Sequence, residues 1–503
     1  MLWKELVKIA LLGTEHSSFN ELTISKLTDF GIETSKEPSY QLAEAAAMVS
    51  QFRKAGFHLQ DFQGKLPSPS QSTTGKQTTA KTSQHLRMIL AGPQMPVLPE
   101  FLYLMKKNGR LLPTAELPAL MWLPDIETYW KAIAPLIGED GHWLLNQNPA
   151  WANRLKSAQS FDWQTGSRTE RFSQFRFWRE QSPKFALELL ASTWETESPA
   201  DKANFIGFMD TGLSLEDEAF LEKCLDDRRK EVRQAAAQLL PKITESKLAK
   251  RMVARAKSCV IFSNNKLKIN VLESLDLAAL RDGLLHIHLG WPGGAQAGIL
   301  GQMIALVSPE IWEKQSTPDE VLQLFLKSDW NETLLRAVVE ATVLHQNHKW
   351  AFALLDFWQK NDSLQFWEMP ICNQLAKLVS PPEVNQLATR FLKEKAMLPT
   401  EGTSVFRLLK FSEANWSHEL SLLIVSLFRK EIVQDYRQFW QLQHLKEYLQ
   451  MLGLRSDPNL FEQIQTGWSN DSVQWRMWEK PVEDMLTRLL FRREMRQNIQ
   501  AAD

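Results

Sequence analysis

The chain is poor in the residues that mark several common protein classes. Its 503 residues include only three cysteines, Cys224, Cys259 and Cys372, which lie far apart and form no C-x-x-C pair. This spacing supports neither a disulfide framework nor a thiolate zinc site, and it suits a reducing compartment. Only 21 residues are glycine, and alternating runs of β-branched residues are few, which argues against a large β-sandwich or barrel.

An excess of one charge and a long apolar run are also missing. Lys and Arg total 58 against 59 Asp and Glu, so the net charge is −1, and the overall electrostatic case for a nucleic-acid or membrane-surface protein disappears. No run approaches the about 18 uninterrupted apolar residues of a membrane span. Lys4 and Lys8 interrupt the apolar N-terminal stretch, which makes it a poor signal peptide and favours an amphipathic helix. We expect a soluble, cytoplasmic protein.

What the chain does contain is helix-forming sequence. Leu, Ala, Glu, Gln, Lys and Arg dominate, and these residues lose little on entering a helix. Helical periodicity, broken by serine and proline punctuation, recurs in nine segments: 185–196, 216–225, 229–240, 246–257, 319–327, 332–345, 382–396, 418–430 and 438–452. Short helices joined by short loops predict an all-α fold, a multihelical array of stacked antiparallel helix pairs of the HEAT-like or α-solenoid kind.

Composition divides the chain into five regions. Residues 62–84 hold few apolar side chains and no acidic one, so we predict a flexible linker there. It follows an N-terminal helical unit, 1–61, and precedes a proline-rich helical region, 85–160, whose helices must be short. We assign HEAT-like helical repeats to 161–260 and a C-terminal helical array to 261–503.

The segment Leu225–Leu240, LDDRRKEVRQAAAQLL, carries the clearest repeat pattern. Asp226 or Asp227 can cap the following helix, and Arg233 can reach back toward an aspartate. The pattern D-x-x-x-x-V-R-x-x-A-x-x-L resembles the second helix of a HEAT-like repeat, whose first helix would be Glu216–Cys224. The helix places thin and branched apolar side chains on one face: Val232, Ala235, Ala236 and Leu239.

A second motif carries a family resemblance. Residues Gly141–Trp151, GHWLLNQNPAW, look like the G-x-W-L-x-x-Q-N-P-x-W motif of a bacterial family catalogued as a domain of unknown function. The similarity extends to Ala10–Glu15, to Trp194 with Glu195, and to the D-D-R-x-x-E-V-R segment, Asp226–Arg233. The resemblance implies a bacterial, helical, HEAT-like accessory protein without an assigned catalytic residue. It also implies genes near those of a MoxR-type AAA+ ATPase, a von Willebrand factor A-type protein and a SWIM zinc-finger protein.

The polar residues of this motif have two interpretations. Asn146, Gln147 and Asn148 could present amide groups to a peptide or ligand backbone. Alternatively, Asn148 caps a helix start while Trp143 and Trp151 pack the loop onto the core, which is the interpretation we favour. With the charged residues of the repeat-like segment, the candidate interaction residues are Trp143, Asn146, Gln147, Asn148, Trp151, Asp227, Arg228 and Arg233.

Metal and nucleotide sites find little support. His286 and His288 resemble half a metal site, and His345 and His348 lie three residues apart, but neither pair has a third ligand in the sequence. Five glycines could suggest a phosphate loop, although the G-x-x-x-x-G-K-[ST] motif is absent. They are Gly290, Gly293, Gly294, Gly298 and Gly301. We expect the last three, which lie on one helical face, to permit a close helix crossing, and we predict no metal and no cofactor.

Charged clusters are interpreted as helix faces. Arg168–Arg179 and Arg488–Arg496 interleave arginines with aromatic or apolar residues, a combination that could bind nucleic acid. Helical spacing favours a core stripe beside a solvated basic face. We likewise expect the acidic residues of one helix start to lie on a solvated face: Glu216, Asp217, Glu218 and Glu222.

Our leading hypothesis is a non-enzymatic helical-repeat scaffold that binds another protein. Through the family resemblance, that partner would belong to an AAA+ ATPase and von Willebrand A-type system. One alternative is a nucleic-acid-binding array using Arg168–Arg179 and the C-terminal arginines, which we consider less favoured. The other is an enzyme of unrecognised type, which requires the Gly141–Trp151 loop and the His286 turn to converge in a cleft.

Overall fold

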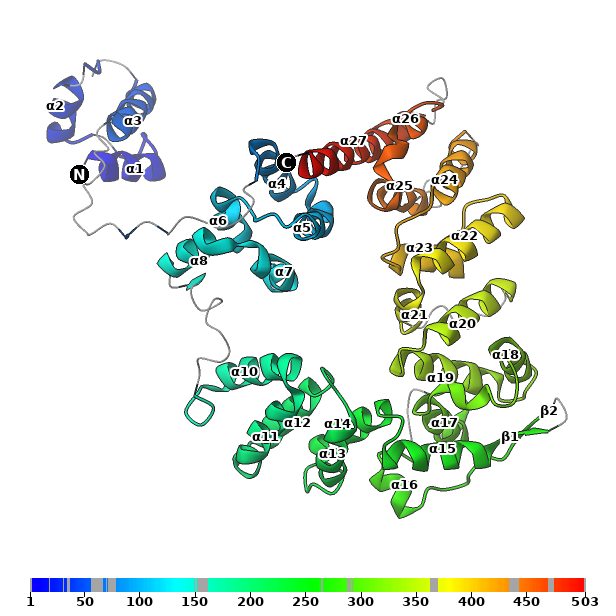
Figure 1. The fold of residues 1–503 in the computed structure, drawn as a ribbon. Coiled ribbons are helices and arrows are strands. Elements are labelled where there is room, and N and C mark those ends of the chain that lie inside the picture. Colours follow the sequence, from blue (N-terminus) through cyan, green and yellow to red (C-terminus); the bar gives the residue numbers. More distant parts are fainter. Residues whose placement is uncertain are drawn as a thin grey trace. The chain divides into compact units, whose positions relative to one another are not determined.

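The computed structural model divides the chain into two compact units, Met1–Pro69 and Ser70–Asp503 (Figure 1). The boundary between them falls inside the segment predicted as a linker. The structure describes residues 2–17, 19–29, 31–33, 37–55, 67–68, 70, 78–148, 150–151, 162–263, 266–286, 291, 293–361, 370–433, 443–468 and 475–501.

The N-terminal unit consists of α1 (Leu2–Leu12), α2 (Glu21–Asp29) and α3 (Pro38–Ala55). The amphipathic N-terminal helix expected from the sequence is therefore confirmed as α1. The unit has a small core in which α1 packs against α3. Its buried apolar side chains are Leu6, Ile9, Leu27, Ile32, Ala45 and Val49.

The second unit begins with five helices in the proline-rich region. They are α4 (Ala80–Leu90), α5 (Leu98–Lys107), α6 (Leu117–Met121), α7 (Ile126–Ile133) and α8 (Gly138–Gln147). The five helices are short, as expected. Prolines occupy the first turns of α5 and α6, where the missing N–H costs nothing. The predicted linker is wrong at its C-terminal end, because Thr79 accepts a hydrogen bond from Thr82 N (3.2 Å) and caps α4.

Six further helices and a hairpin follow. The helices are α10 (Arg168–Gln181), α11 (Pro183–Thr193), α12 (Pro199–Phe208), α13 (Glu218–Cys224), α14 (Lys230–Leu239) and α15 (Lys247–Cys259). Strands β1 (Val260–Ser263) and β2 (Lys266–Ile269) pair in antiparallel register, with Val260 opposite Ile269. The sequence analysis missed this hairpin. Its alternating K-L-K-I pattern and the packing of Phe262 against Trp312 and Phe325 favour strands.

The rest of the second unit is helical. Its elements are α16 (Leu277–Arg281), α17 (Gly294–Ala305), α18 (Pro318–Leu326), α19 (Asn331–Leu344), α20 (His348–Lys360), α21 (Cys372–Leu378), α22 (Pro381–Lys395), α23 (Ser404–Phe411), α24 (His418–Glu431), α25 (Gln443–Arg455), α26 (Phe461–Ile464) and α27 (Trp475–Gln500). Every one of the nine predicted segments overlaps one of the observed helices along most of its described length, and residues 438–442 of the ninth lie outside the described residues. The all-α prediction is confirmed.

Helices that are next but one along the chain pack against each other. This holds for α10, α12 and α14, for the odd-numbered helices from α15 to α23, for α22 and α24, and for α25 and α27. Ion pairs repeat the pattern, because Lys242 reaches Asp210 (2.7 Å), Lys349 reaches Glu313 and Lys410 reaches Glu447 (2.8 Å). Such regular spacing is what stacked helix pairs produce, since each pair contacts mainly its neighbours.

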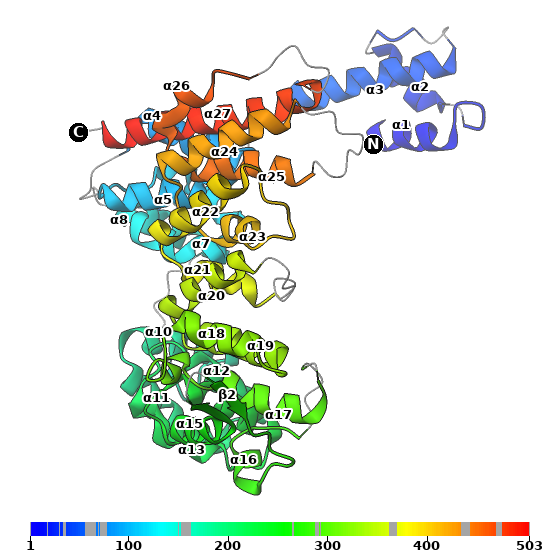
Figure 2. The ribbon, with the colours of Figure 1, turned by 90° about the vertical axis from the view of Figure 1, so that its right-hand side faces the viewer.

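The last helix is different, because it contacts the first helices of its unit. α27 packs on α25 and also on α4 and α5, and the two views show it beside α4 (Figures 1 and 2). Phe491, Met495 and Ile499 belong to the same apolar cluster as residues of α4 to α8. The predicted regions 85–160 and 261–503 therefore share a core that their sequences did not reveal.

Buried tryptophans fill the space between helices. Trp312, Trp350, Trp358 and Trp478 are among the largest fully buried side chains. Trp122 is the reverse case, with 71% of its surface exposed. None of the helices in the described part of the chain combines the length and apolar character of a membrane span.

Candidate functional site

The GHWLLNQNPAW motif lies mostly on α8 and is built for packing. Gly141 is buried, and a Cβ atom there would come within 2.9 Å of Leu117 Cδ1 on α6. Trp151 is buried and its ring meets that of Trp122 edge to face at 5.9 Å. Asn148 ends α8, and its Oδ1 accepts from Ala150 N (3.0 Å). These contacts support the structural interpretation for the glycine, the second tryptophan and the asparagine.

Two amides of the motif remain at the surface. Asn146 and Gln147 are exposed, and the Gln147 amide donates to Trp143 O within its own helix at 3.3 Å. Trp143 itself is half-buried. The recognition interpretation stays open at these three positions, because two of the side chains are exposed and the third is half-buried.

In the repeat-like segment, the candidate side chains form hydrogen bonds with backbone atoms of the same segment. Asp227 Oδ1 accepts from Arg229 N (2.8 Å), whereas Arg233 Nη1 donates to the backbone oxygens of Asp227 (2.8 Å) and Arg228 (3.1 Å). Arg233 therefore does reach back to an aspartate, and the acceptor is the backbone oxygen of Asp227. Asp226 does not cap the helix, because its carboxylate pairs with Arg281 (2.7 Å). Arg228 is exposed.

The two groups of candidate residues are not brought together. Trp151 belongs to the apolar cluster of α4 to α8, whereas Val232 beside Arg233 belongs to the larger cluster of the following helices. Within the described part of the chain we find no contact between the two groups. His286 is exposed and His288 lies outside the described residues, so the convergence required by the enzyme hypothesis receives no support.

Two of the four acidic residues expected on a solvated face are instead engaged in ion pairs. Asp217 is buried and receives both terminal nitrogens of Arg179 at 2.8 and 2.9 Å. Glu222 pairs with Arg251 (2.9 Å) and Arg281 (3.2 Å). The solvated-face prediction is wrong for these two, because basic side chains of neighbouring helices reach them.

Asp282 extends this network beneath a hollow. Its carboxylate is 1% exposed and accepts from Arg251 (2.6 Å) and Arg255 (2.7 Å). The two arginines thus compensate the negative charge of Asp282 inside the fold, which is what a buried carboxylate requires. It supplies a fixed edge to the hollow rather than a reactive group.

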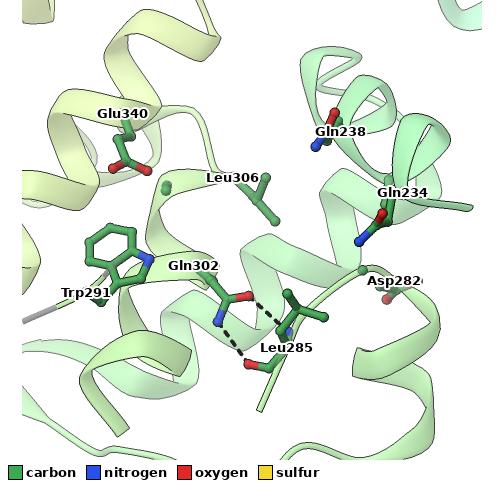
Figure 3. A pocket seen from close by; sticks show the side chains of 11 residues that line it. Gln234, Gln238, Asp282, Leu285, Trp291, Gln302, Leu306 and Glu340 are labelled. Carbon is green, nitrogen blue, oxygen red and sulfur yellow. Dashed lines mark hydrogen bonds between the residues drawn. The ribbon is translucent and has the colours of Figure 1, made fainter. Parts of the chain in front are cut away.

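The hollow itself holds about 320 Å³ and lies among α14, α16, α17 and α19. Gln302 of α17 is hydrogen-bonded there to the backbone of Leu285. Its side-chain oxygen accepts from Leu285 N and its side-chain nitrogen donates to Leu285 O, both at 2.9 Å (Figure 3). Gln234 and Gln238 of α14 line the opposite side and are exposed. The lining is therefore rich in amide groups, which recognise peptide backbones.

Trp291 forms another wall of the hollow and explains Gly301. A Cβ atom at Gly301 would lie 2.4 Å from Trp291 Cε3, so the glycine makes room for the indole ring. The predicted helix crossing is therefore wrong for Gly301, whose close neighbour is this ring, and for Gly294, beside which a Cβ atom would meet nothing within 4 Å. Arg336 lies over the same ring at 4.8 Å and pairs with Glu340 (3.1 Å), so the cation is held in place.

A larger groove runs between α26 and α27. It holds about 740 Å³, and its apolar lining includes Phe461, Trp468, Trp475, Leu486 and Leu490. Its charged lining residues, Glu479 and Glu483, are both acidic and exposed. Aromatic walls beside a charged rim are typical of a protein-binding surface.

The histidine and cysteine side chains considered as possible ligands or nucleophiles make contacts within the fold or are buried. His345 Nε2 lies 3.3 Å from Leu306 O and His348 Nδ1 lies 2.5 Å from Leu378 O, so each ring faces a different carbonyl. Burial lowers the pKa of His345 and raises the pKa of Cys224 and of Cys372 to about 12, which keeps these thiols protonated. In the described residues no group of three potential ligands could hold a metal ion.

Most arginines of the two arginine-rich segments contact carboxylates or aromatic rings within the protein, whether they are buried or exposed. Arg168, Arg171 and Arg179 of α10 pair with Asp201, Glu197 and Asp217 respectively, and Arg176 lies over Phe208 at 4.0 Å. On α27, Arg492 and Arg496 share Glu100, while Arg493 pairs with Glu462. Phe175 is fully buried, which confirms the core stripe. Arginines engaged in this way are not available to phosphates without losing internal contacts.

Sequence comparison places nearly the whole chain in one family. Residues 5–499 match the model of a family of unknown function (DUF5691). The chain belongs to this family. Comparison with characterised proteins and with solved structures found no match.

Sequence reasoning missed both the hollow and the groove. The two α14 glutamines are spaced i, i+4, which would have placed them on one helix face, but their partners come from helices far along the chain. Glu479 and Glu483 have the same spacing, and Trp468 and Trp475 precede them in the sequence. These spacings can be read from the sequence. The depth of the hollow and of the groove cannot, because it depends on how distant helices pack.

Proposed function

We propose that this family member is a non-enzymatic helical scaffold that binds another protein. The observation that carries the proposal is the lining of its two surface depressions, which present amides, aromatic rings and exposed carboxylates. Such groups recognise a partner without changing it. The buried carboxylate that borders the hollow, Asp282, is neutralised by arginines, and the thiols are protonated by burial.

The identity of the partner rests on the family resemblance in the sequence. It implies a component of an assembly containing a MoxR-type AAA+ ATPase and a von Willebrand factor A-type protein. A stacked-helix array suits such an accessory role because it displays a long series of helix ends and faces without needing a catalytic cleft.

Nucleic acid is the less favoured partner. Both arginine-rich segments spend most of their guanidinium groups on internal carboxylates and carbonyls. Binding through counterion release requires cations that can contact phosphates, and it weakens steeply with salt. We therefore expect no shift of labelled DNA or RNA by the full chain at low salt.

The proposal is tested by reconstitution. The full chain is mixed with the purified ATPase and the von Willebrand A-type protein encoded in its own genome, and the mixture is analysed by light scattering during size-exclusion chromatography. A stable complex with one of them supports the scaffold. Separate elution at tens of micromolar, together with salt-sensitive DNA or RNA binding, would contradict it.

A further inference from the structure

The groove between α26 and α27 has a shape that suits a helix. Its lining residues on α27 begin at Trp475 and end at Leu490, and they recur at helical spacing through Glu479, Glu483 and Leu486. At 1.5 Å per residue this stripe is about 22 Å long, the length of a helix of about 15 residues. The turn after α26 supplies the opposite wall with Trp468.

The walls are apolar but incompletely covered. Phe461, Trp468 and Trp475 are each half-buried, and the rings of the two tryptophans lie 6.2 Å apart. Leu486 and Leu490 are also half-buried along the same groove. Half-exposed aromatic rings are the usual anchors of protein interfaces, because covering them removes much apolar area from water.

The charge of the groove selects the occupant. Glu479 makes no ion pair among the described residues, and Glu483 has only the exposed Lys480 at 3.4 Å. Two arginines lie over the aromatic wall. Arg429 covers the Trp468 ring at 4.8 Å and donates to Ile464 O (2.9 Å), and Arg493 lies over the Phe461 ring at 4.7 Å and pairs with Glu462 (2.8 Å). The groove rim on α27 therefore presents two exposed carboxylates, of which Glu479 has no ion-pair partner among the described residues.

We propose that this groove binds an amphipathic helix of a partner protein, with an apolar face toward the tryptophans and lysines or arginines toward Glu479 and Glu483. The proposal rests on the scaffold function and names the surface and the chemistry of its partner. Apolar residues at i, i+3, i+4 and i+7 of the bound helix would fill the groove, as in other helix-in-groove complexes. Basic residues flanking that stripe would meet the two glutamates and would set the orientation of the helix.

Model peptides test the inference directly. The probes are a labelled amphipathic helix of about 15 residues made of leucine and lysine, and the matched peptide in which glutamate replaces every lysine. Fluorescence anisotropy with the full chain measures binding, and hydrogen–deuterium exchange locates it. We expect the basic peptide to bind and to protect α26 and α27, and the acidic peptide not to bind.

Charge reversal then separates this groove from other acidic surfaces. The variant Glu479→Lys with Glu483→Lys should weaken binding of the basic peptide about tenfold, because attraction becomes repulsion. The control Glu394→Lys with Glu494→Lys has the same net charge and changes exposed residues outside the groove, so it should leave binding nearly unchanged. Glu479→Gln with Glu483→Gln, which removes charge without reversing it, should give a smaller loss in the same direction.

Four results would overturn the inference. One is equal weakening by the groove and control variants, which would indicate a general acidic attraction. Another is no binding of the basic peptide. The third is a dimer of the full chain that the groove variant converts to a monomer, because the occupant would then be a second copy. A reconstituted partner that the groove variant still binds would remove the groove and leave the scaffold function intact.

Discussion

Two arginine clamps, one on α10 and one on α27, make the most instructive comparison within the second unit. Arg179 is fully buried and joins Asp217 to the backbone oxygens of Met209 and Thr211, all within 38 residues along the chain. Arg492 is equally buried but joins Glu100, which is 392 residues away, to Gly453 O and Ser456 O. The same side-chain chemistry thus stabilises one local helix stack and one contact between the first and last helices of the unit.

The two arginines differ in which helices they hold together. The α10 clamp forms as soon as two neighbouring helix pairs stack, because its partners come from adjacent turns. The α27 clamp needs the packing of α25, α26 and α27 against α4 and α5. We infer that loss of the first weakens one block of helices, whereas loss of the second loosens the contact between distant blocks.

The largest effect is expected for Asp217→Ala. It leaves the Arg179 charge buried without a carboxylate and removes the acceptor of Ser214 N (3.0 Å). We expect the free energy of local opening of α10 and α12 to fall by about 3–5 kcal/mol. Hydrogen exchange of their amides measures it. Asp210→Ala, which breaks an exposed pair with Lys242, is the matched control and should change little.

A double replacement sharpens this first prediction. Arg179→Met with Asp217→Leu removes both charges and fills the space with apolar atoms, so much of the lost stability should return. A double variant as unstable as Asp217→Ala would mean that the backbone contacts of Arg179, and not its charge pairing, stabilise the block.

Glu100→Ala should have a smaller and differently placed effect. Arg492 loses its carboxylate but keeps Gly453 O (2.8 Å) and Ser456 O (2.9 Å), and Arg496 loses the same partner. We expect a loss of about 2–3 kcal/mol. Exchange should accelerate in α4, α5 and α27 while α10 and α12 remain protected. Equal acceleration in all five helices would contradict the distinction between the two clamps.

The helices could be predicted from sequence because their periodicity is local. The segment 332–345 became α19, and 418–430 became α24, because apolar residues at helical spacing can be buried on one face whatever lies opposite. The starts of several helices were likewise marked by hydroxyl residues or proline. Thr317, for example, completes a capping box with Glu320.

The candidate site was less predictable because its residues depend on distant partners. Asp217 looked like one solvated acid among several, and only the stacking of α10 shows that Arg179 reaches it. The motif residues Gly141 and Trp151 were recognisable, and the structure shows why they pack. The groove beside Glu479 required two helices and the turn between them, a combination that no single-segment pattern contains.

Acid should affect the α27 side through Asp457. Burial alone would raise the pKa of Asp457, but hydrogen bonds from His418 and Asn459 N and the charge of Arg496 lower it below 3.8. A lowered folded-state pKa means that the carboxylate stabilises the fold above pH 3.8, and that this contribution is lost as the pH falls through the lower value. We expect the C-terminal helices to loosen in that range.

The variant Asp457→Asn isolates this carboxylate from the others. Asparagine can still accept from Asn459 N, so the local turn is kept while the charge is removed. The variant should be less stable than the wild type at neutral pH, and the difference should shrink below pH 3.8. Thermal melts of both proteins across this pH range measure the difference in stability. A difference that stays constant with pH would show that Asp457 acts through packing and not through its charge.

The smallest effects are expected at the exposed pair of each segment. Arg168 pairs with Asp201 at 2.5 Å on α10, and Arg493 pairs with Glu462 at 2.8 Å beside α27, but each pair has one partner more than 60% exposed. Arg168→Gln and Glu462→Gln should each cost less than about 1 kcal/mol, and less still in high salt, because solvent and ions screen such pairs. Hydrogen exchange at two salt concentrations measures both. If either variant loosened its helix as much as the buried clamp variants do, the stabilising role would belong to the whole basic face, and the contrast between Arg179 and Arg492 would no longer explain how the unit is held together.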